Sequence, residues 1–179
     1  KPQVCVLGSA EPGSDAYELA GQAGTLLARH GITVVSGCGS PATRVAAQRA
    51  IAAGGLVLSI VPPDQMPDAD WPATVVVPCG MGDARNLLMA LAGDACLVIG
   101  GRAGTISEVC LAWLHKRPLL PLVGCGGSRV RLPPVAAARF GQVNSRSLCS
   151  LRQQRGAGGT AVRRSCERNA TIGALRSEA

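Results

Sequence analysis

The sequence predicts an α/β fold, in which a doubly wound and mainly parallel sheet of about six or seven strands carries helices on both faces. Three observations lead to this prediction. Short apolar runs alternate along the chain with segments of helical periodicity, which is the order expected of βαβ units with right-handed crossovers. The apolar runs do not alternate with polar residues, as expected for strands buried on both faces. Several of them end in glycine-rich loops.

Six apolar runs are predicted as strands, and they comprise residues 4–7, 32–35, 56–61, 74–77, 95–99 and 119–123. Four helices are predicted between them, at residues 15–30, 43–53, 83–92 and 106–115. The first helix has apolar residues at helical spacing and stops at Gly31, because glycine is favoured just after a helix. Residues 62–72 contain four prolines and three aspartates and are predicted as a loop.

The net charge of +7 is unevenly distributed over the 179 residues. Residues 1–127 contain 8 basic and 9 acidic side chains, whereas residues 128–179 contain 10 basic and 2 acidic ones. We expect a nearly neutral ligand-binding domain at 1–127 and a basic, Arg/Ser/Gly-rich appendage at 128–179 that is partly disordered or atypical. No nucleic-acid partner is expected, because the domain lacks a basic field and the chain has few aromatic residues for base stacking.

The chain has no run of about 18 uncharged apolar residues, so no membrane span is expected. Its eight cysteines include no C-x2–4-C pair, the spacing that is typical of a zinc ribbon. Cys5, Cys96 and Cys110 stand in apolar runs and are interpreted as small core residues. A reduced, cytoplasmic setting is therefore expected.

Four predicted strand ends carry glycine-rich loops, at residues 8–9, 37–40, 80–82 and 100–105. In a doubly wound sheet, ligands bind outside the carboxyl ends of the strands. Glycine lets the backbone approach an anion, and helix N-termini direct N–H groups at it. The chain lacks both the G-x-G-x-x-G fingerprint after its first strand and the Walker lysine motif. A phosphorylated small molecule is the expected ligand, whereas turn geometry alone would explain any single loop.

Two motifs make this expectation more specific. One predicted helix opens with Gly82-Asp83-Ala84-Arg85-Asn86, and the next opens with Gly100-Gly101-Arg102-Ala103-Gly104-Thr105-Ile106-Ser107-Glu108. Together these residues resemble the PGGxGTxxE family of lysine-decarboxylase-like proteins, which includes the LONELY GUY cytokinin-activating enzymes. The chain departs from the enzymes at Gly100, Arg102 and Asn86. These departures make it more similar to the branch that includes the algal molybdenum cofactor carrier protein.

The resemblance implies a Rossmann-like homo-oligomer, with a tetramer favoured, and a pocket at the strand ends. In the carrier branch the ligand is molybdenum cofactor (molybdopterin), which is stored and protected without catalysis for molybdoenzymes such as nitrate reductase. In the enzyme branch, Arg85 and Glu108 correspond to the residues that release base from a nucleoside 5′-monophosphate. The expected ligand-binding residues are Gly8, Ser9, Gly37, Cys38, Gly39, Ser40, Arg85, Asn86, Gly100, Gly101, Arg102, Ala103, Gly104, Thr105 and Glu108.

Some of these residues also have a structural interpretation. Arg85 and Glu108 are alternatively an ion pair between two helix N-termini, a position that suits the glutamate through the helix dipole. Thr105 either offers its hydroxyl to the ligand or caps the helix that follows. Trp71, in the proline-rich loop, either packs on the surface or covers a ring of the ligand, and Cys38 is expected to face that ligand.

Overall fold

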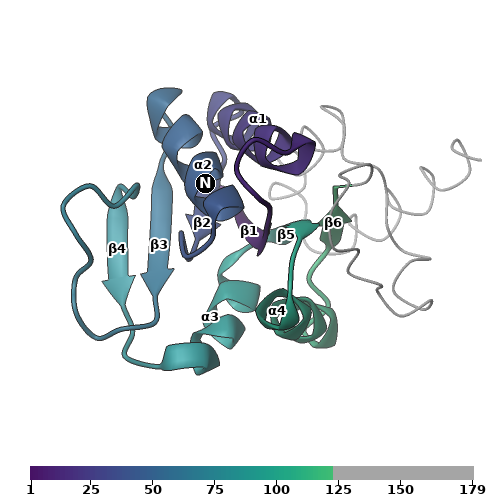
Figure 1. Cartoon of the computed structure of the whole chain (residues 1–179). Coiled ribbons are helices and arrows are strands. Elements are labelled where there is room, and N and C mark those ends of the chain that lie inside the picture. Colours follow the sequence, from purple (N-terminus) through teal and green to yellow (C-terminus); the bar gives the residue numbers. More distant parts are fainter. Residues whose placement is uncertain (123–179) are drawn as a thin grey trace, which may run out of the picture.

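The computed structural model describes residues 1–122, which contain a six-stranded parallel sheet in the order β4-β3-β2-β1-β5-β6 (Figure 1). Its strands are β1 (Gln3–Ser9), β2 (Thr33–Ser36), β3 (Val57–Val61), β4 (Val75–Pro78), β5 (Ala95–Gly100) and β6 (Leu119–Pro121). The helices are α1 (Asp15–Arg29), α2 (Pro41–Ala52), α3 (Arg85–Ala92) and α4 (Ala103–Leu114), and a short 3-10 turn, η1 (Gly82–Ala84), precedes α3. The predicted α/β class is confirmed. The predicted appendage, residues 128–179, lies outside the described residues.

The central strand of the sheet is β1. It pairs with β2 from Gln3 opposite Thr33, and with β5 along a longer register that ends with Ser9 opposite Gly100. The chain therefore winds outward from β1 to β4 and then returns to the other side of β1 to form β5. Such a reversal of strand order is the topological switch point, and it lies between the carboxyl ends of β1 and β5.

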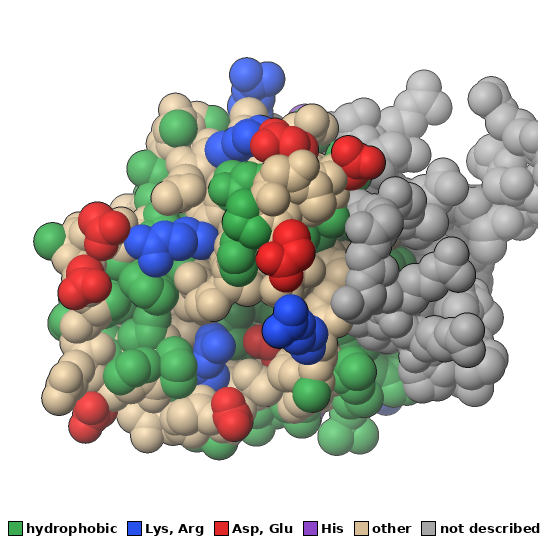
Figure 2. Space-filling model, viewed as in Figure 1, with side chains coloured by type: hydrophobic (Ala, Val, Ile, Leu, Met, Phe, Trp, Pro, Cys, Tyr) green, Lys and Arg blue, Asp and Glu red, His purple; other side chains and the backbone are tan. Residues whose placement is uncertain are grey.

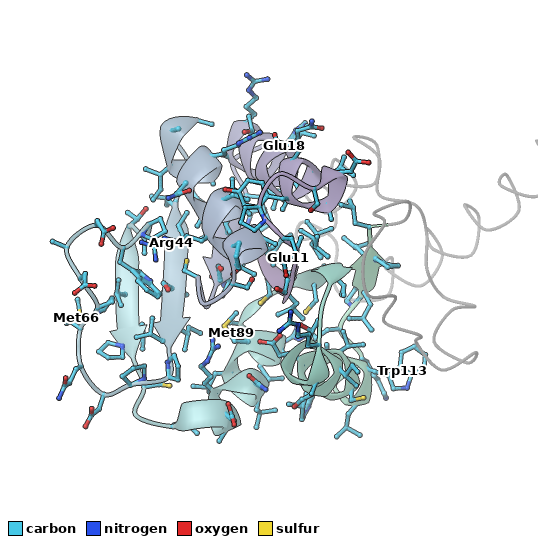
Figure 3. The ribbon with its side chains drawn as sticks, in the orientation of Figure 1. Glu11, Glu18, Arg44, Met66, Met89 and Trp113 are labelled. Carbon is cyan, nitrogen blue, oxygen red and sulfur yellow. The ribbon has the colours of Figure 1, made fainter. Side chains whose placement is uncertain are left out.

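Helices α1 and α2 cover one face of the sheet, and α3 and α4 cover the other (Figure 1). The first layer is built from small side chains, with Ala42, Ala46, Ala47 and Ala50 of α2 fully buried. A side chain at Gly24 of α1 would overlap the Ala46 carbonyl, so the two helices meet backbone to backbone. In the second layer Met89 of α3 is buried against the sheet (Figure 3).

The two helical layers differ at their outer surfaces. Charged side chains gather over α1 and α2, where Arg49 donates to Glu18 at 2.6 Å (Figure 2). Apolar side chains gather over α4 at the lower right of the same view.

Cys110 is exposed on α4, so its interpretation as a core residue is wrong, whereas Cys5 and Cys96 are fully buried as predicted. Within residues 1–122, no helix has the length and apolar character needed to cross a membrane.

The loop between β3 and β4 folds back onto the first layer through Trp71. The Trp71 indole donates from Nε1 to Oγ of the buried Ser59 at 2.9 Å. The Arg44 guanidinium lies over the indole ring, 5.1 Å from its centre. Trp71 therefore packs on the protein, as one of its two interpretations predicted, and its ring is already partnered.

A candidate anion-binding site at the strand ends

The predicted glycine loops of β1 and β5 meet at the topological switch point. Gly8 has a φ of +129°, and a side chain there would overlap the backbone of Ile99 on β5. Gly101 has a φ of +126°, and a side chain there would crowd the Thr105 side chain. Both positions require glycine, because L-residues avoid these conformations and the space is occupied. Glycine at these two positions thus lets the β1 and β5 loops pack closely against Ile99 and Thr105 at the switch point.

Arg85 is held at this edge of the sheet by the start of α3. Its Nη1 donates to the Ile60 carbonyl of β3 at 3.1 Å. A side chain at Gly37, just after β2, would overlap the same nitrogen, so the guanidinium lies directly against the loop that follows β2. Only part of its hydrogen-bonding capacity is used by Ile60, because a guanidinium carries five N–H donors.

Glu108 lies on the first turns of α4 and is buried, with 9% of its surface exposed. Burial raises the pKa of its carboxyl to about 7, because the charged form loses its water, and the nearby Arg85 guanidinium opposes that rise only in part. Among the described residues its carboxyl has neither an ion pair nor a hydrogen bond. The ion-pair interpretation of Arg85 and Glu108 is therefore wrong. A buried carboxyl without a partner is available to a ligand that brings a hydrogen-bond donor.

Asn86 and Thr105 lie on the two helices that carry these side chains, and both are buried. Asn86 is buried and donates from Nδ2 to Ser107 Oγ at 3.4 Å, a long hydrogen bond that joins α3 to α4. Thr105 is also buried, in the first turn of α4. Because α4 begins at Ala103 with Arg102 in the capping position, Thr105 does not cap it.

The loop from Gly37 to Ser40 offers fewer free backbone N–H groups to an anion than the sequence led us to expect. Ser40 and Thr43 form a capping box, and Pro41 has no N–H to offer, so few amides at the start of α2 remain free. The Ser40 hydroxyl also donates to the Gly8 carbonyl at 2.7 Å, which ties this loop to β1. Affinity for an anion on this side must come mainly from side chains.

Cys38 has a positive φ of +47°, and its side chain is 2% exposed. Its sulfur lies 3.5 Å from Ser36 Oγ and 3.7 Å from the Pro72 carbonyl oxygen. Burial raises the pKa of the thiol, so it stays protonated at neutral pH. Cys38 is thus a wall residue and not a thiolate ligand. Residues 1–122 contain no group of three or more His, Cys, Asp or Glu placed to hold a metal ion.

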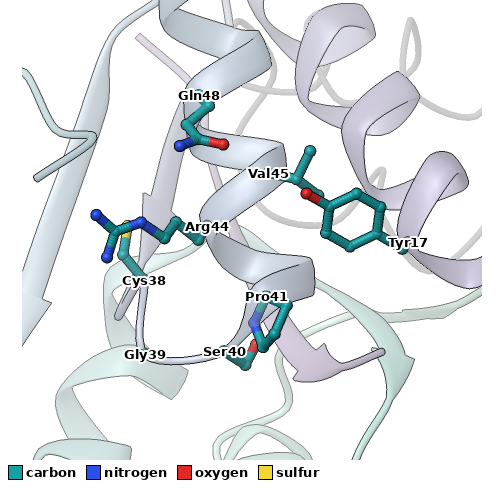
Figure 4. Close-up of a pocket in the computed structure, with 8 residues that line it drawn as sticks. All are labelled: Tyr17, Cys38, Gly39, Ser40, Pro41, Arg44, Val45 and Gln48. Atoms are coloured by element: carbon teal, nitrogen blue, oxygen red, sulfur yellow. The ribbon is translucent and has the colours of Figure 1, made fainter. Parts of the chain in front are cut away.

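A cavity of about 360 Å³ lies on the α1–α2 side of this loop (Figure 4). It is lined by Tyr17, Cys38, Gly39, Ser40, Pro41, Arg44, Val45 and Gln48. Arg44 is the basic residue of this lining, and sequence reasoning missed it. The sequence feature that could have pointed to Arg44 is its place on the helix that directly follows the glycine loop. The guanidinium pairs with the exposed Asp70 at 3.3 Å, an ion pair weak enough for a ligand anion to replace.

The remaining expected residues lie at the rim. The Arg102 side chain is 82% exposed and pairs with Glu11 at 3.6 Å, so it points into solvent beside the β1 and β5 loops. Ala103 and Gly104 are exposed in the first turn of α4, and a side chain at Gly104 would meet only open space. The structure therefore brings Gly8, Ser9, Gly37, Arg85, Gly100 and Gly101 together at the strand ends, with Glu108 buried beside them.

Comparison with known proteins shows the family to which this chain belongs. The model of the SLOG cluster4 family matches residues 1–147. The chain belongs to the SLOG cluster4 family. An uncharacterized protein of Archaeoglobus fulgidus is 31% identical over 141 residues, which are 77% of this chain and 93% of that protein. The family match extends past residue 127, where the sequence placed the domain boundary.

Solved structures resemble this SLOG cluster4 chain over most of its length. The molybdenum cofactor binding protein of Rippkaea orientalis is 30% identical with a TM-score of 0.63, over 68% of this chain and 76% of its own. The molybdenum cofactor carrier protein of Chlamydomonas reinhardtii, 22% identical, has a TM-score of 0.68 over 86% and 96%. DNA processing protein A of Helicobacter pylori, 17% identical, has a TM-score of 0.65 over 85% and 80%. The last two show the shared fold alone.

Proposed function

We propose that this chain binds, stores and protects molybdenum cofactor for transfer to molybdoenzymes such as nitrate reductase, without catalysing a reaction. The observation that carries the proposal is the arrangement of Arg85 and an unpartnered, buried Glu108 at the switch point of a chain 30% identical to a molybdenum cofactor binding protein. The proposal includes a cytoplasmic setting and a homo-oligomer, and the carrier resemblance favours a tetramer.

The residues at the strand ends fit such a ligand. Molybdopterin combines a pterin ring that carries N–H donors with a phosphate and a dithiolene that holds the metal. The Glu108 carboxyl suits the donors of the ring, and the free N–H groups of Arg85 suit an anionic group. Gly8 and Gly101 let the loops after β1 and β5 pack closely against Ile99 and Thr105, which fixes the shape of the strand ends beside Arg85. The molybdenum arrives as part of the cargo, so the chain needs no metal site of its own.

A second candidate is a nucleoside 5′-monophosphate phosphoribohydrolase of the cytokinin-activating type. One specific observation favours it, because the buried Glu108 carboxyl has a pKa of about 7. A group that titrates near the working pH is suited to general acid–base catalysis. Hydrolysis of an N-glycosidic bond builds positive charge on the sugar, which a carboxylate stabilises. Under this candidate Arg85 and Glu108 are the catalytic residues.

One pair of assays on the same preparation separates the two candidates. Binding of molybdopterin and its protection from oxidation are measured beside release of free base from adenosine and isopentenyladenosine monophosphates. We expect uptake and protection without base release. Base release that disappears in Glu108→Gln contradicts the carrier proposal and supports the hydrolase.

The position of the pocket is tested with Gly104→Asp. A carboxylate there enters open space at the first turn of α4, so the fold is preserved while an anionic ligand is repelled. We expect at least a tenfold loss of affinity for molybdopterin, about 1.4 kcal/mol. Gly101→Asp is less informative, because its side chain would collide with Thr105. An unchanged affinity in Gly104→Asp, with a stability equal to that of the parent chain, contradicts a ligand site at this helix start.

A further inference from the structure

The cavity beside α2 lies next to the strand-end site but is lined by other side chains (Figure 4). Its lining comes from α1, α2 and the loop before α2, whereas Arg85 and Glu108 stand on α3 and α4, in the other helical layer. Gly39 separates the two, because it lines the cavity and a side chain built on it would lie 4.0 Å from Arg85 Nη2. The function proposed above rests on Arg85 and Glu108 and makes no use of this cavity.

The lining of the cavity carries a positive charge. Among the described residues that form it, Arg44 is the charged side chain and none is a carboxylate. The Cys38 thiol in the same wall is uncharged at neutral pH, because burial raises its pKa. Walls of low dielectric constant concentrate the field of a single charge in such a space. The cavity therefore favours an anionic ligand over a neutral or cationic one.

Neighbouring residues hold the Arg44 guanidinium in place before any ligand binds. It lies over the Trp71 indole, 5.1 Å from the ring centre, and the indole is itself fixed by its 2.9 Å hydrogen bond to Ser59. Its Nη2 pairs with Asp70 at 3.3 Å, but the Asp70 side chain is 78% exposed, so water weakens this pair. The contact with the ring engages no acceptor atom, so the other N–H groups of the guanidinium are available to an oxyanion. Donors that are oriented in advance bind phosphate or carboxylate through two parallel hydrogen bonds.

The rest of the lining suits an aromatic body. Figure 4 shows Arg44 and Tyr17 at opposite ends of the lining, with the apolar Val45 between them. Gln48 adds an amide, which both donates and accepts hydrogen bonds. The volume of about 360 Å³ lies near the lower end of the range of about 300–1,000 Å³ that is usual for small-molecule sites. The cavity therefore accommodates one ring with its anionic group and excludes a much larger ligand.

We propose that this cavity binds a small aromatic molecule that carries a phosphate or carboxylate group, with Arg44 as the anchor of that group. The anion replaces Asp70 as the partner of the guanidinium, and the ring lies against Tyr17 and Val45. This ligand is separate from the one proposed for the strand ends, and its site does not depend on that proposal.

Isothermal titration calorimetry on the full-length chain tests the cavity with three probes. Phenyl phosphate and benzoate carry the two candidate anionic groups on the same ring, and inorganic phosphate carries the anion without a ring. We expect saturable binding of at least one ring probe, and the tighter of the two identifies the anionic group. Inorganic phosphate is expected to bind at least about threefold more weakly, because it gains no apolar contact.

Three variants locate the bound probe. Arg44→Gln removes the anchor and is expected to weaken binding of the ring probe at least about tenfold, because charge-assisted hydrogen bonds are lost. Asp70→Asn removes the competing carboxylate and is expected to strengthen binding by about two- to fivefold. Arg49→Gln is the matched control and is expected to keep the parent affinity. Arg49 stands on the same helix, is 38% exposed against 35% for Arg44, and has its own ion pair with Glu18.

Circular dichroism verifies that each variant is folded. If Arg44→Gln does not fold, Arg44→Lys replaces it, because lysine keeps the charge but loses the planar fork and is also expected to weaken binding. Failure of both ring probes to bind overturns the proposal, as does parent affinity in a folded Arg44 variant. Loss of binding in Arg85→Gln but not in Arg44→Gln would locate the probe at the strand ends and also overturns it. None of these results decides the proposed function, because molybdopterin binding is measured separately.

Discussion

At the scale of single residues, the protonation of Glu108 links the site to stability. Its folded-state pKa of about 7 lies above the usual 4.5 of a glutamate, because burial disfavours the charged form. The folded protein therefore binds the proton more tightly than the unfolded chain does. The resulting stabilisation is complete below about pH 4.5 and is lost as the pH rises through about 7.

The variant Glu108→Gln makes this linkage measurable, because it keeps the size of the side chain and removes the charge. At pH 8 we expect it to raise the free energy of unfolding by up to about 3 kcal/mol, from 1.36 kcal/mol per pKa unit. At pH 4.5 the two proteins are expected to unfold at nearly the same urea concentration. Glu11→Gln, at a carboxyl that is 80% exposed, is the control and is expected to change little at either pH. Equal stability of Glu108→Gln and the parent at pH 8 contradicts the raised pKa.

The positions of the candidate site residues in the fold were predictable where a motif contained them. Arg85 and Glu108 stand in short sequence patterns at strand ends, and the structure places both at one edge of the sheet. Arg44 stands on the helix that follows a glycine loop, but no motif includes it, and the orientation of its side chain depends on Trp71 and Asp70 of a distant loop. That Cys38 faces a ligand stays a prediction: the residue lines the cavity, and burial raises the pKa of its thiol.

At the scale of elements, the contact between α1 and α2 depends on Gly24. Glycine inside a helix normally destabilises it by about 0.5–1 kcal/mol relative to alanine. Here the added methyl group would overlap the Ala46 carbonyl of α2, so Gly24→Ala is expected to destabilise the protein by about 1–3 kcal/mol. Urea denaturation measures the change.

Gly104 provides the matched control, because a side chain there meets open space on α4. Gly104→Ala is expected to stabilise the protein by about 0.5–1 kcal/mol. The two Gly→Ala variants are thus expected to change the free energy of unfolding in opposite directions. Stabilisation by Gly24→Ala would show that α1 and α2 are further apart than the structure has them.

The existence and order of the elements were predictable, because apolar runs and glycine stops are local features. All four helices and six strands of residues 1–122 lie where the pattern predicts them, within a few residues at each end. The start of α4 was placed too late, at Ile106 instead of Ala103, because Gly104 suggested a loop. The strand order was not predicted, since it depends on the packing of the helices on the two faces and not on any local signal.

At the scale of the whole molecule, the uneven distribution of charge between residues 1–127 and 128–179 determines how strongly the chain is expected to bind nucleic acid. The likeness to DNA processing protein A, at 17% identity, shows the shared fold alone, and the described part of this chain is nearly neutral. We expect any affinity of the full chain for a single-stranded oligonucleotide to fall steeply with salt and to vanish near physiological ionic strength. Fluorescence anisotropy measures it, and tight binding that resists salt contradicts the expectation.

The central position of β1 has a consequence for the synthesis of the protein. Its first neighbour, β2, follows soon after it, but β5, which pairs with it along a longer register, comprises residues 95–100. At roughly 5–20 residues per second on the ribosome, one edge of the first strand stays open for several seconds while the rest of the sheet is translated. Until β5 has been synthesised, the unpaired apolar edge of β1 could pair with a strand of a neighbouring chain. A chaperone that binds the nascent chain in this interval would prevent such pairing.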